Sequence, residues 1–331
     1  MLEFLTLTVL AKPVWMWLVF TLVVVALLAF DLGVLHRGSK EISVRESLLL
    51  SGFYILMGVL FGAWVWWQIS PQAGLEYLTG YVIEKSLSMD NIFVIAMIFG
   101  YFGVPRAYQH RVLFWGILAV ILLRGLMIGV GAALVAQFSW VLYVFAAFLV
   151  ATGVKMLIAA DKAYDVESNP LLKFMRKRFR VTDRLQGERF FVREKDPATG
   201  ALVTSMTPLF LVLVLVNVAD VVFAVDSVPA IFAITTDVYL VFTSNIFAIL
   251  GLRALYFALA AMIDRFAYLK YALATVLIFI GSKIVVADML GVAKIPPAVS
   301  LGATFAILGA GVGWSLWKTR AAPVLVRDGA E

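Results

Sequence analysis

The stretch Glu84-Lys85-Ser86-Leu87-Ser88-Met89-Asp90-Asn91 places charged side chains inside a run of apolar residues. With its apolar flanks, the segment covers about 75–101 and is long enough to cross a bilayer. A charged residue at the centre of a bilayer costs about 2.5–3.5 kcal/mol on insertion scales, so such residues persist mainly where they serve a function. This stretch therefore predicts a functional site inside a membrane-spanning helix.

A second stretch, Asn217 to Ser227, repeats the arrangement further along the chain. Each stretch carries two acids six residues apart, and we interpret the two pairs as halves of one buried cation site. The predicted metal ligands are Glu84, Asp90, Asp220 and Asp226. Candidate secondary oxygen ligands beside these acids are Ser88, Asn91, Asn217 and Ser227; their alternative role is hydrogen bonding between helices.

Basic residues also fall inside the apolar segments, and we expect them to balance the acids: Lys85, Arg124, Arg253 and Lys283. The two arginines are expected to hold the carboxylates charged and oriented. The alternative is a set of structural ion pairs, although desolvation offsets much of the attraction in buried pairs. The four acids outnumber Lys85, Arg124 and Arg253, which leaves negative charge for a cation or for protons.

The composition is that of a polytopic membrane protein. Of 331 residues, 63% are hydrophobic and 15% charged, whereas about a quarter of the residues of a soluble protein are charged. The net charge of +6 comes with basic residues in loops, so nucleic-acid binding is not expected. The chain has no cysteine, and its two histidines lie in polar loops. A metal in the membrane must therefore be bound mainly by oxygen, which suits Mn²⁺, Mg²⁺ or Ca²⁺.

Hydropathy predicts an all-α fold of about nine transmembrane helices in a single transport domain over 1–331. The expected spans are about 14–35, 46–68, 75–101, 111–136, 139–160, 207–233, 240–262, 269–290 and 297–318. Lysine and arginine fall on alternate connections, with only Lys12 and Lys294 on the opposite set. The positive-inside rule then predicts an outside N-terminus and a cytoplasmic C-terminus.

The cytoplasmic connection of about 161–206 is the only long one. Its basic part, 170–180, predicts an amphipathic helix that lies on anionic lipid headgroups. The alternative is a loop whose charges only set the topology. Farther along, Arg189–Arg193 and Ala201–Thr204 flank Asp196-Pro197-Ala198-Thr199-Gly200. That pattern predicts a small β-hairpin.

Repeat one, about 75–160, and repeat two, about 207–290, share landmarks in the same order. After the acids, each carries an arginine in the middle of its second helix and ends on Gly153-Val154-Lys155 or Gly281-Ser282-Lys283. Because each repeat has three spans, the two insert in opposite directions, which places a site near the bilayer midplane. The flanking helices are about 14–35, 46–68 and 297–318. Residues six apart on an intact helix point about 120° apart, so we expect both acidic helices to be interrupted at the site.

The chain resembles the TerC family in several motifs that span nearly its whole length. They are Glu84–Asn91, Phe223–Ala233, Ser244–Arg253 and the loop Phe190–Arg193. Within that family the layout is similar to the Alx-type manganese exporters. The resemblance implies a nine-helix bacterial inner-membrane transporter that exports Mn²⁺ and uses the paired acids as its metal site. One departure is Asn217, where the family often has an acid, so the site is one charge weaker.

Carboxylates that release Mn²⁺ when protonated suggest exchange of the metal for protons. Mg²⁺ or Ca²⁺ as substrate remains an alternative, as does a non-transporting subunit that supplies metal to exported proteins. A homo-oligomer and a secretion-machinery partner are both compatible with the sequence, and membrane lipids surround the chain. No resident cofactor and no enzyme activity are expected, because the Gly-x-Gly-Asp signature of intramembrane aspartyl hydrolases is missing.

Overall fold

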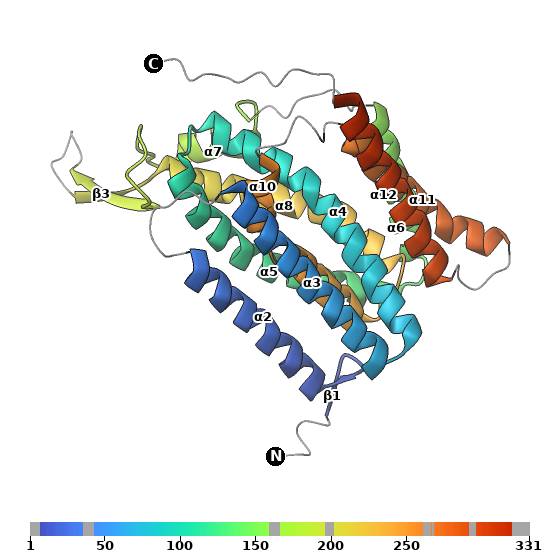
Figure 1. The fold of residues 1–331 in the computed structure, drawn as a ribbon. Coiled ribbons are helices and arrows are strands. Elements are labelled where there is room, and N and C mark those ends of the chain that lie inside the picture. Colours follow the sequence, from blue (N-terminus) through green and yellow to red (C-terminus); the bar gives the residue numbers. More distant parts are fainter. Residues whose placement is uncertain are drawn as a thin grey trace.

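The computed structural model describes residues 7–35, 43–158, 166–195, 202–260, 266, 268–290 and 296–319. The fold is a bundle of long helices with two small antiparallel hairpins (Figure 1). The helices are α2 (Val14–Leu35), α3 (Val44–Gln68), α4 (Pro71–Tyr101), α5 (Arg106–Gln137), α6 (Val141–Ile158), α7 (Pro170–Arg178), α8 (Pro208–Phe232), α9 (Val238–Ile249), α10 (Leu252–Ala260), α11 (Leu269–Met289) and α12 (Pro297–Thr319).

Each apolar segment expected from the sequence contains a helix, and 240–262 contains two. Among the described residues, seven helices are long and apolar enough to cross a membrane. The count is eight if α9 and α10, bent by 42° at their junction, form one span. The remaining long helix, α4, has 31 residues and carries Glu76, Glu84, Lys85 and Asp90. The fold is thus a multi-pass helical membrane protein, and the ninth span depends on this charged helix.

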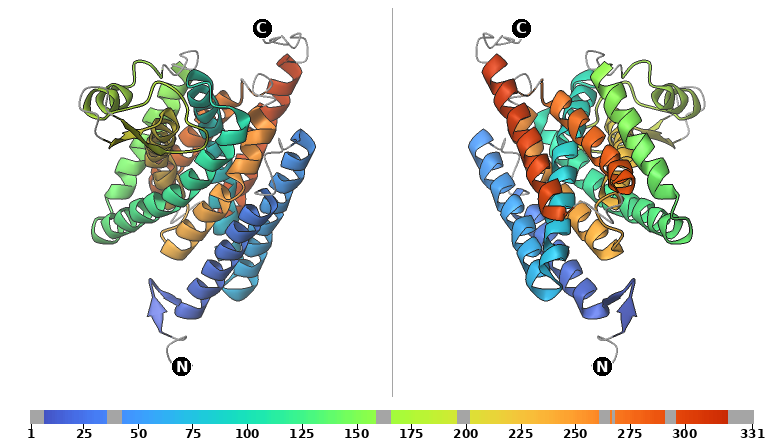
Figure 2. Two further views of the ribbon diagram at one scale, coloured as in Figure 1. Left: turned by 90° about the vertical axis from the view of Figure 1, so that its left-hand side faces the viewer. Right: turned by 90° about the vertical axis from the view of Figure 1, so that its right-hand side faces the viewer.

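The connection between α6 and α8 contains the predicted hairpin. Strands β3 (Phe191–Lys195) and β4 (Leu202–Met206) pair antiparallel, with Phe191 opposite Met206. The shorter hairpin of β1 (Thr8–Val9) and β2 (Lys12–Pro13) lies on the other side of the molecule (Figure 2). The two hairpins thus project from opposite ends of the helix bundle.

Helix α7 begins at an N-cap, Asn169, whose side chain accepts hydrogen bonds from the next backbone amides, with proline at the first helical position. Its Leu172 and Met175 are buried in the main apolar core beside residues of α4 and α8. The apolar side of α7 therefore packs on the protein, while its basic residues Arg176, Lys177 and Arg178 are exposed.

Helices α4 and α8 run without interruption through their acidic residues. The prediction of helices broken at the acids was wrong. The two acids of one helix do not need to point into the same space, because they contact different neighbouring helices. The break occurs instead between α9 and α10, where Gly251 adopts φ +78°. A Cβ at Gly251 would lie 2.5 Å from Cβ of Tyr54, so this turn favours glycine on both grounds.

The acids lie where the longest helices cross. Helix α4 packs against α3, α8 and α9, and α5 packs against α8. Helix α6 packs along α11, with Gly153 close to Ala274 and Ile278, and Gly281 close to Ala146. These contacts run antiparallel, so the last turn of α6 lies beside the first turn of α11.

Candidate cation site

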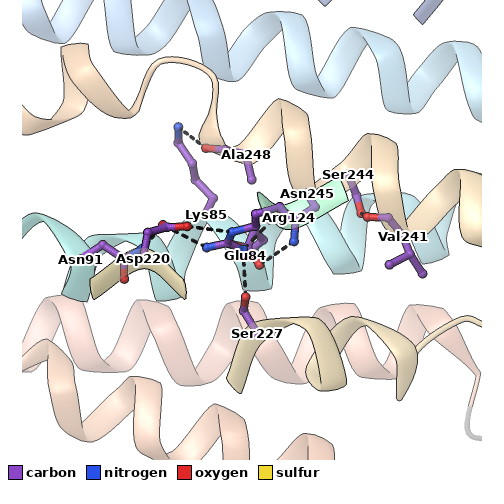
Figure 3. Close-up of polar contacts among 10 residues, drawn as sticks. All are labelled: Glu84, Lys85, Asn91, Arg124, Asp220, Ser227, Val241, Ser244, Asn245 and Ala248. Carbon is purple, nitrogen blue, oxygen red and sulfur yellow. Dashed lines mark hydrogen bonds and ion pairs between the residues drawn. The ribbon is translucent and has the colours of Figure 1, made fainter. Parts of the chain in front are cut away.

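Arg124, in the middle of α5, lies at the centre of the charged cluster. Its exposed fraction is 1%. Its guanidinium forms an ion pair with Glu84 of α4. It also donates two hydrogen bonds to Asp220 of α8, from Nε to Oδ2 and from Nη2 to Oδ1, each 3.2 Å long. Nη1 donates to Ser227 Oγ at 2.9 Å and to Asn245 Oδ1 at 3.3 Å (Figure 3). One cation therefore ties together α4, α8 and α9.

Glu84 and Asp220 have further hydrogen-bond donors. Asn245 Nδ2 donates to the second oxygen of Glu84 at 3.1 Å. Asn91 Nδ2 donates to Asp220 Oδ1 at 3.0 Å. Every oxygen of these two carboxylates thus accepts a hydrogen bond, and the guanidinium of Arg124 already supplies a cation to both acids. We call Glu84, Asp220 and Arg124 the inner cluster.

Asp90 and Asp226 face a different space, a cavity of about 330 Å³. The residues that line it are Glu84, Leu87, Ser88, Asp90, Asn91, Arg124, Thr152, Lys155, Met156, Phe223, Asp226, Ser227, Lys270 and Leu277. Asp226 accepts a hydrogen bond from Thr152 Oγ1 of α6 at 3.2 Å. The cavity thus joins one acid of α4 and one acid of α8, with Glu84 and Arg124 of the inner cluster as part of its wall.

The six-residue spacing explains this division of the four acids. Residues six apart on a continuous helix point about 120° away from each other. Glu84 and Asp220 turn toward Arg124, whereas Asp90 and Asp226 turn toward the cavity bordered by α6 and α11. The spacing therefore produces two neighbouring acidic pairs, each containing one residue from α4 and one from α8.

Two buried oxygens at the cavity have no hydrogen-bond partner within the described part of the chain, Ser88 Oγ and Asn91 Oδ1. An unsatisfied buried polar atom is costly unless water or a ligand completes it. Hydroxyl and amide oxygens beside carboxylates are the donor set of hard divalent cations. The cavity residues therefore fit such an ion.

Besides Lys85, three predicted site residues lie elsewhere. Asn217 donates to Leu213 O within its own helix at 2.7 Å and does not line the cavity. Arg253 forms a buried ion pair with Asp31 of α2 at 2.8 Å, away from the four acids. Lys283 donates to Ser300 Oγ of α12 at 3.1 Å.

Lys85 points away from the acids next to it in the sequence. Its Nζ donates to the backbone oxygen of Ala248 at 3.0 Å (Figure 3). It also donates to the backbone oxygen of Leu250 at 3.3 Å. These carbonyls lie at the break between α9 and α10. Lys85 therefore binds carbonyl groups at the end of α9. It does not pair with Glu84 or Asp90, so it does not balance their charges as the sequence analysis expected.

The prediction of one cradle made by four carboxylates needs correction. Among the residues that the structure describes, no three acidic or histidine side chains converge as a metal-binding group. The physical reason is Arg124, which occupies the space between Glu84 and Asp220. The two acids left for an ion in this arrangement are Asp90 and Asp226.

Sequence reasoning missed several residues of the site: Asn245, Thr152, Lys155 and Lys270. Lys155 and Lys270 lie near helix ends, where a lysine usually reaches the interface, so their sequence position gives no hint of the cavity. Asn245 lies within the motif Ser244–Arg253, and a polar residue inside an apolar helix was the signal that could have found it.

The long apolar helices and the charged cluster buried between them define this chain as a multi-pass integral membrane protein. It belongs to the TerC family: the sequence pattern described as "Integral membrane protein TerC family" matches residues 69–322.

Relatives align along almost the full chain. The membrane protein STKORF319 of Myxococcus xanthus is 46% identical over 313 residues, which cover 95% of each chain. The Escherichia coli K12 protein named "Putative membrane-bound redox modulator Alx" is 47% identical over 303 residues, 88% of this chain and 91% of the relative. A membrane protein of Rickettsia bellii is 46% identical over 296 residues, 89% and 95% of the two chains. No solved structure matches.

Proposed function

We propose that this protein transports a hard divalent cation, Mn²⁺ above all, out of the cytoplasm across the bacterial inner membrane. The observation that carries the proposal is the cavity in which Asp90 and Asp226, from α4 and α8, face the unpartnered oxygens of Ser88 and Asn91. Charged groups within membrane-spanning helices cost free energy, and they are retained where an ion passes. The chain as a whole acts as one transport domain.

Reciprocal packing supports the inverted repeat that this proposal uses. Gly153 of α6 lies against Ala274 and Ile278 of α11, and Gly281 of α11 lies against Ala146 and Val150 of α6. Aligning the two glycines in sequence also places Ala146 on Ala274 and Val150 on Ile278. Equivalent helices that exchange equivalent contacts are what a two-fold relation between repeats produces.

The position of two lysines at the cavity supports the orientation that we propose. The cavity reaches Lys155 in the last turn of α6 and Lys270 in the first turn of α11, on the side of the basic connection. The positive-inside rule assigns that side to the cytoplasm and the N-terminal hairpin to the outside. The resemblance to Alx-type exporters favours Mn²⁺ over Mg²⁺ or Ca²⁺.

Export against a negative-inside potential costs about 2.3 kcal/mol per charge at 100 mV. A divalent ion therefore needs a driving force, and the cavity carboxylates offer exchange of the metal for protons. An imposed pH gradient across proteoliposomes should then change the rate of Mn²⁺ flux. A rate that ignores the gradient would remove the coupling and leave cation transport intact.

The name given to the Alx relatives assigns redox modulation to those proteins. This chain contains no cysteine, so thiol exchange within it is excluded. The alternative of a non-transporting subunit that supplies metal predicts no flux from the purified protein alone.

The test is flux of Mn²⁺, Mg²⁺ and Ca²⁺ into proteoliposomes that contain the purified protein. Asp90→Asn and Asp226→Asn preserve shape and remove the cavity charges, and each should lower Mn²⁺ flux at least about tenfold, since a cation ligand is lost (about 1.4 kcal/mol per tenfold). Asn91→Ala should also lower it, whereas the matched change Asn217→Ala should not, because Asn217 lies outside the cavity. Unchanged flux in both aspartate variants would mean that these acids are structural.

A further inference from the structure

We propose that Arg124 is a tethered cation that competes with the transported ion for Glu84 and Asp220. The ion first binds at Asp90 and Asp226 and then displaces the guanidinium from the inner cluster. The inference rests on the proposed function and adds to it a step carried out by a residue of the chain itself.

The geometry of the inner cluster is that of an occupied cation site. Arg124 contacts one carboxylate from each repeat, and its other donors reach the oxygens of Ser227 and Asn245. Carboxylates, a hydroxyl and an amide oxygen are also the ligands that a hard divalent ion selects. The guanidinium thus uses oxygens that suit the ion.

Formal charge indicates what happens when an ion arrives. The cavity and the inner cluster together hold Glu84, Asp90, Asp220 and Asp226 against Arg124, Lys155 and Lys270. With all of these groups charged, one negative charge remains, so a bound divalent ion would leave an excess of one positive charge. Without Arg124, two negative charges remain, which matches the charge of the ion. Displacement of the guanidinium therefore makes the site complementary to its cargo.

Two side chains connect the cavity to the inner cluster. Ser227 lines the cavity and accepts the hydrogen bond from Arg124, and Asn91 lines the cavity and donates to Asp220. Arg124 and Glu84 themselves form part of the cavity wall. An ion at Asp90 and Asp226 is thus adjacent to the guanidinium, with no helix between them.

Arg124→Gln tests the competition, because glutamine keeps a hydrogen-bonding side chain and removes the charge. Mn²⁺ binding to the purified variant, measured by calorimetry, should tighten at least about tenfold relative to the wild type (about 1.4 kcal/mol). Maximal flux in proteoliposomes should fall, because the ion is released slowly from carboxylates that have lost their internal counter-ion. A purely structural arginine would give no gain in affinity.

Arg253→Gln is the matched control. Arg253 is the repeat equivalent of Arg124 and is equally buried, but it pairs with Asp31 outside the cavity. It should lower thermal stability without tightening Mn²⁺ binding. Arg124→Lys is the milder variant: it retains the charge, loses the two-pronged grip on Asp220 and should tighten binding about threefold to fivefold by weakening the competitor.

Unchanged or weaker Mn²⁺ affinity in folded Arg124→Gln would overturn the proposal. If Arg124→Gln does not fold, Arg124→Lys decides in the same way. Tightening by Arg253→Gln to the same degree would also overturn it, because the effect would then be general to buried arginines. Failure of the wild type to bind or transport any divalent ion would instead refute the proposed function.

Discussion

At the scale of single residues, buried charges in this protein take their partners from distant segments. Arg253 of α10 binds both the carboxylate and the backbone oxygen of Asp31 in α2. Lys85 of α4 binds two backbone oxygens at the end of α9. Arg124, by contrast, binds two acids of the candidate site, Glu84 and Asp220.

Lys85→Met should destabilise the protein by roughly 2 kcal/mol. The two carbonyls at the helix break, Ala248 O and Leu250 O, would lose a charged donor in a buried setting, and an unsatisfied buried polar group costs about 1–3 kcal/mol. Thermal unfolding of the purified protein in detergent measures the change. Lys177→Met on the exposed side of α7 is the control and should stay within about 0.5 kcal/mol. Equal stability of the two variants would show that Lys85 does not hold the break together.

The sequence was informative about residue types and much less so about partners. Because charge is costly to bury in a membrane, the four acids and Arg124 could be recognised from the sequence as candidate site residues. Asp31 of α2, for example, is buried against Arg253 of α10. That pair joins helices more than two hundred residues apart, and no local pattern encodes which helices become neighbours.

At the scale of elements, the positions of the helices and the β3–β4 hairpin were predictable, because hydropathy and turn residues are local signals. The break between α9 and α10 was not predicted, although Gly251 marks it. We expected the breaks at the acids, since a common cavity for both acids of a helix required them. The structure satisfies the spacing by giving the two acids of each helix different neighbours.

The close approach of α6 and α11 yields an element-scale prediction. A Cβ at Gly281 would lie 2.6 Å from the backbone oxygen of Ala146, and one at Gly153 would lie 2.7 Å from that of Ala274. Gly281→Ala should therefore force the helices apart and cost about 1–3 kcal/mol. Thermal unfolding should show a lower midpoint, with a similar loss for Gly153→Ala.

Gly129→Ala in α5 is the control for these glycines. Among the described residues, nothing lies within 4 Å of a Cβ added there. Alanine also favours a helix over glycine by about 1 kcal/mol, so this variant should be as stable as the wild type or more stable. Tolerance of alanine at both Gly153 and Gly281 would contradict the tight packing of α6 on α11.

At the scale of the whole molecule, the two ends of the bundle differ in what they expose. One end has the short β1–β2 hairpin, and the other has α7 and the β3–β4 hairpin (Figure 2). Helix α7 carries the exposed basic residues Arg176, Lys177 and Arg178. The cavity reaches toward the second end through Lys155 and Lys270. In the orientation that we propose, with the basic end in the cytoplasm, this cavity would be filled from the inside.

Single-cysteine labelling tests this assignment, and the chain is suited to it because it contains no cysteine of its own. Met156→Cys places a thiol on the cavity wall, and Val9→Cys places one on the opposite hairpin. A membrane-impermeant maleimide should label Val9→Cys, and not Met156→Cys, in right-side-out vesicles. In inside-out vesicles the pattern should reverse, and Mn²⁺ should slow labelling of Met156→Cys because the ion fills the same space. Labelling of Met156→Cys from the outside alone would mean that the cavity faces the other side of the membrane, and export would then have to begin from a different arrangement of the helices.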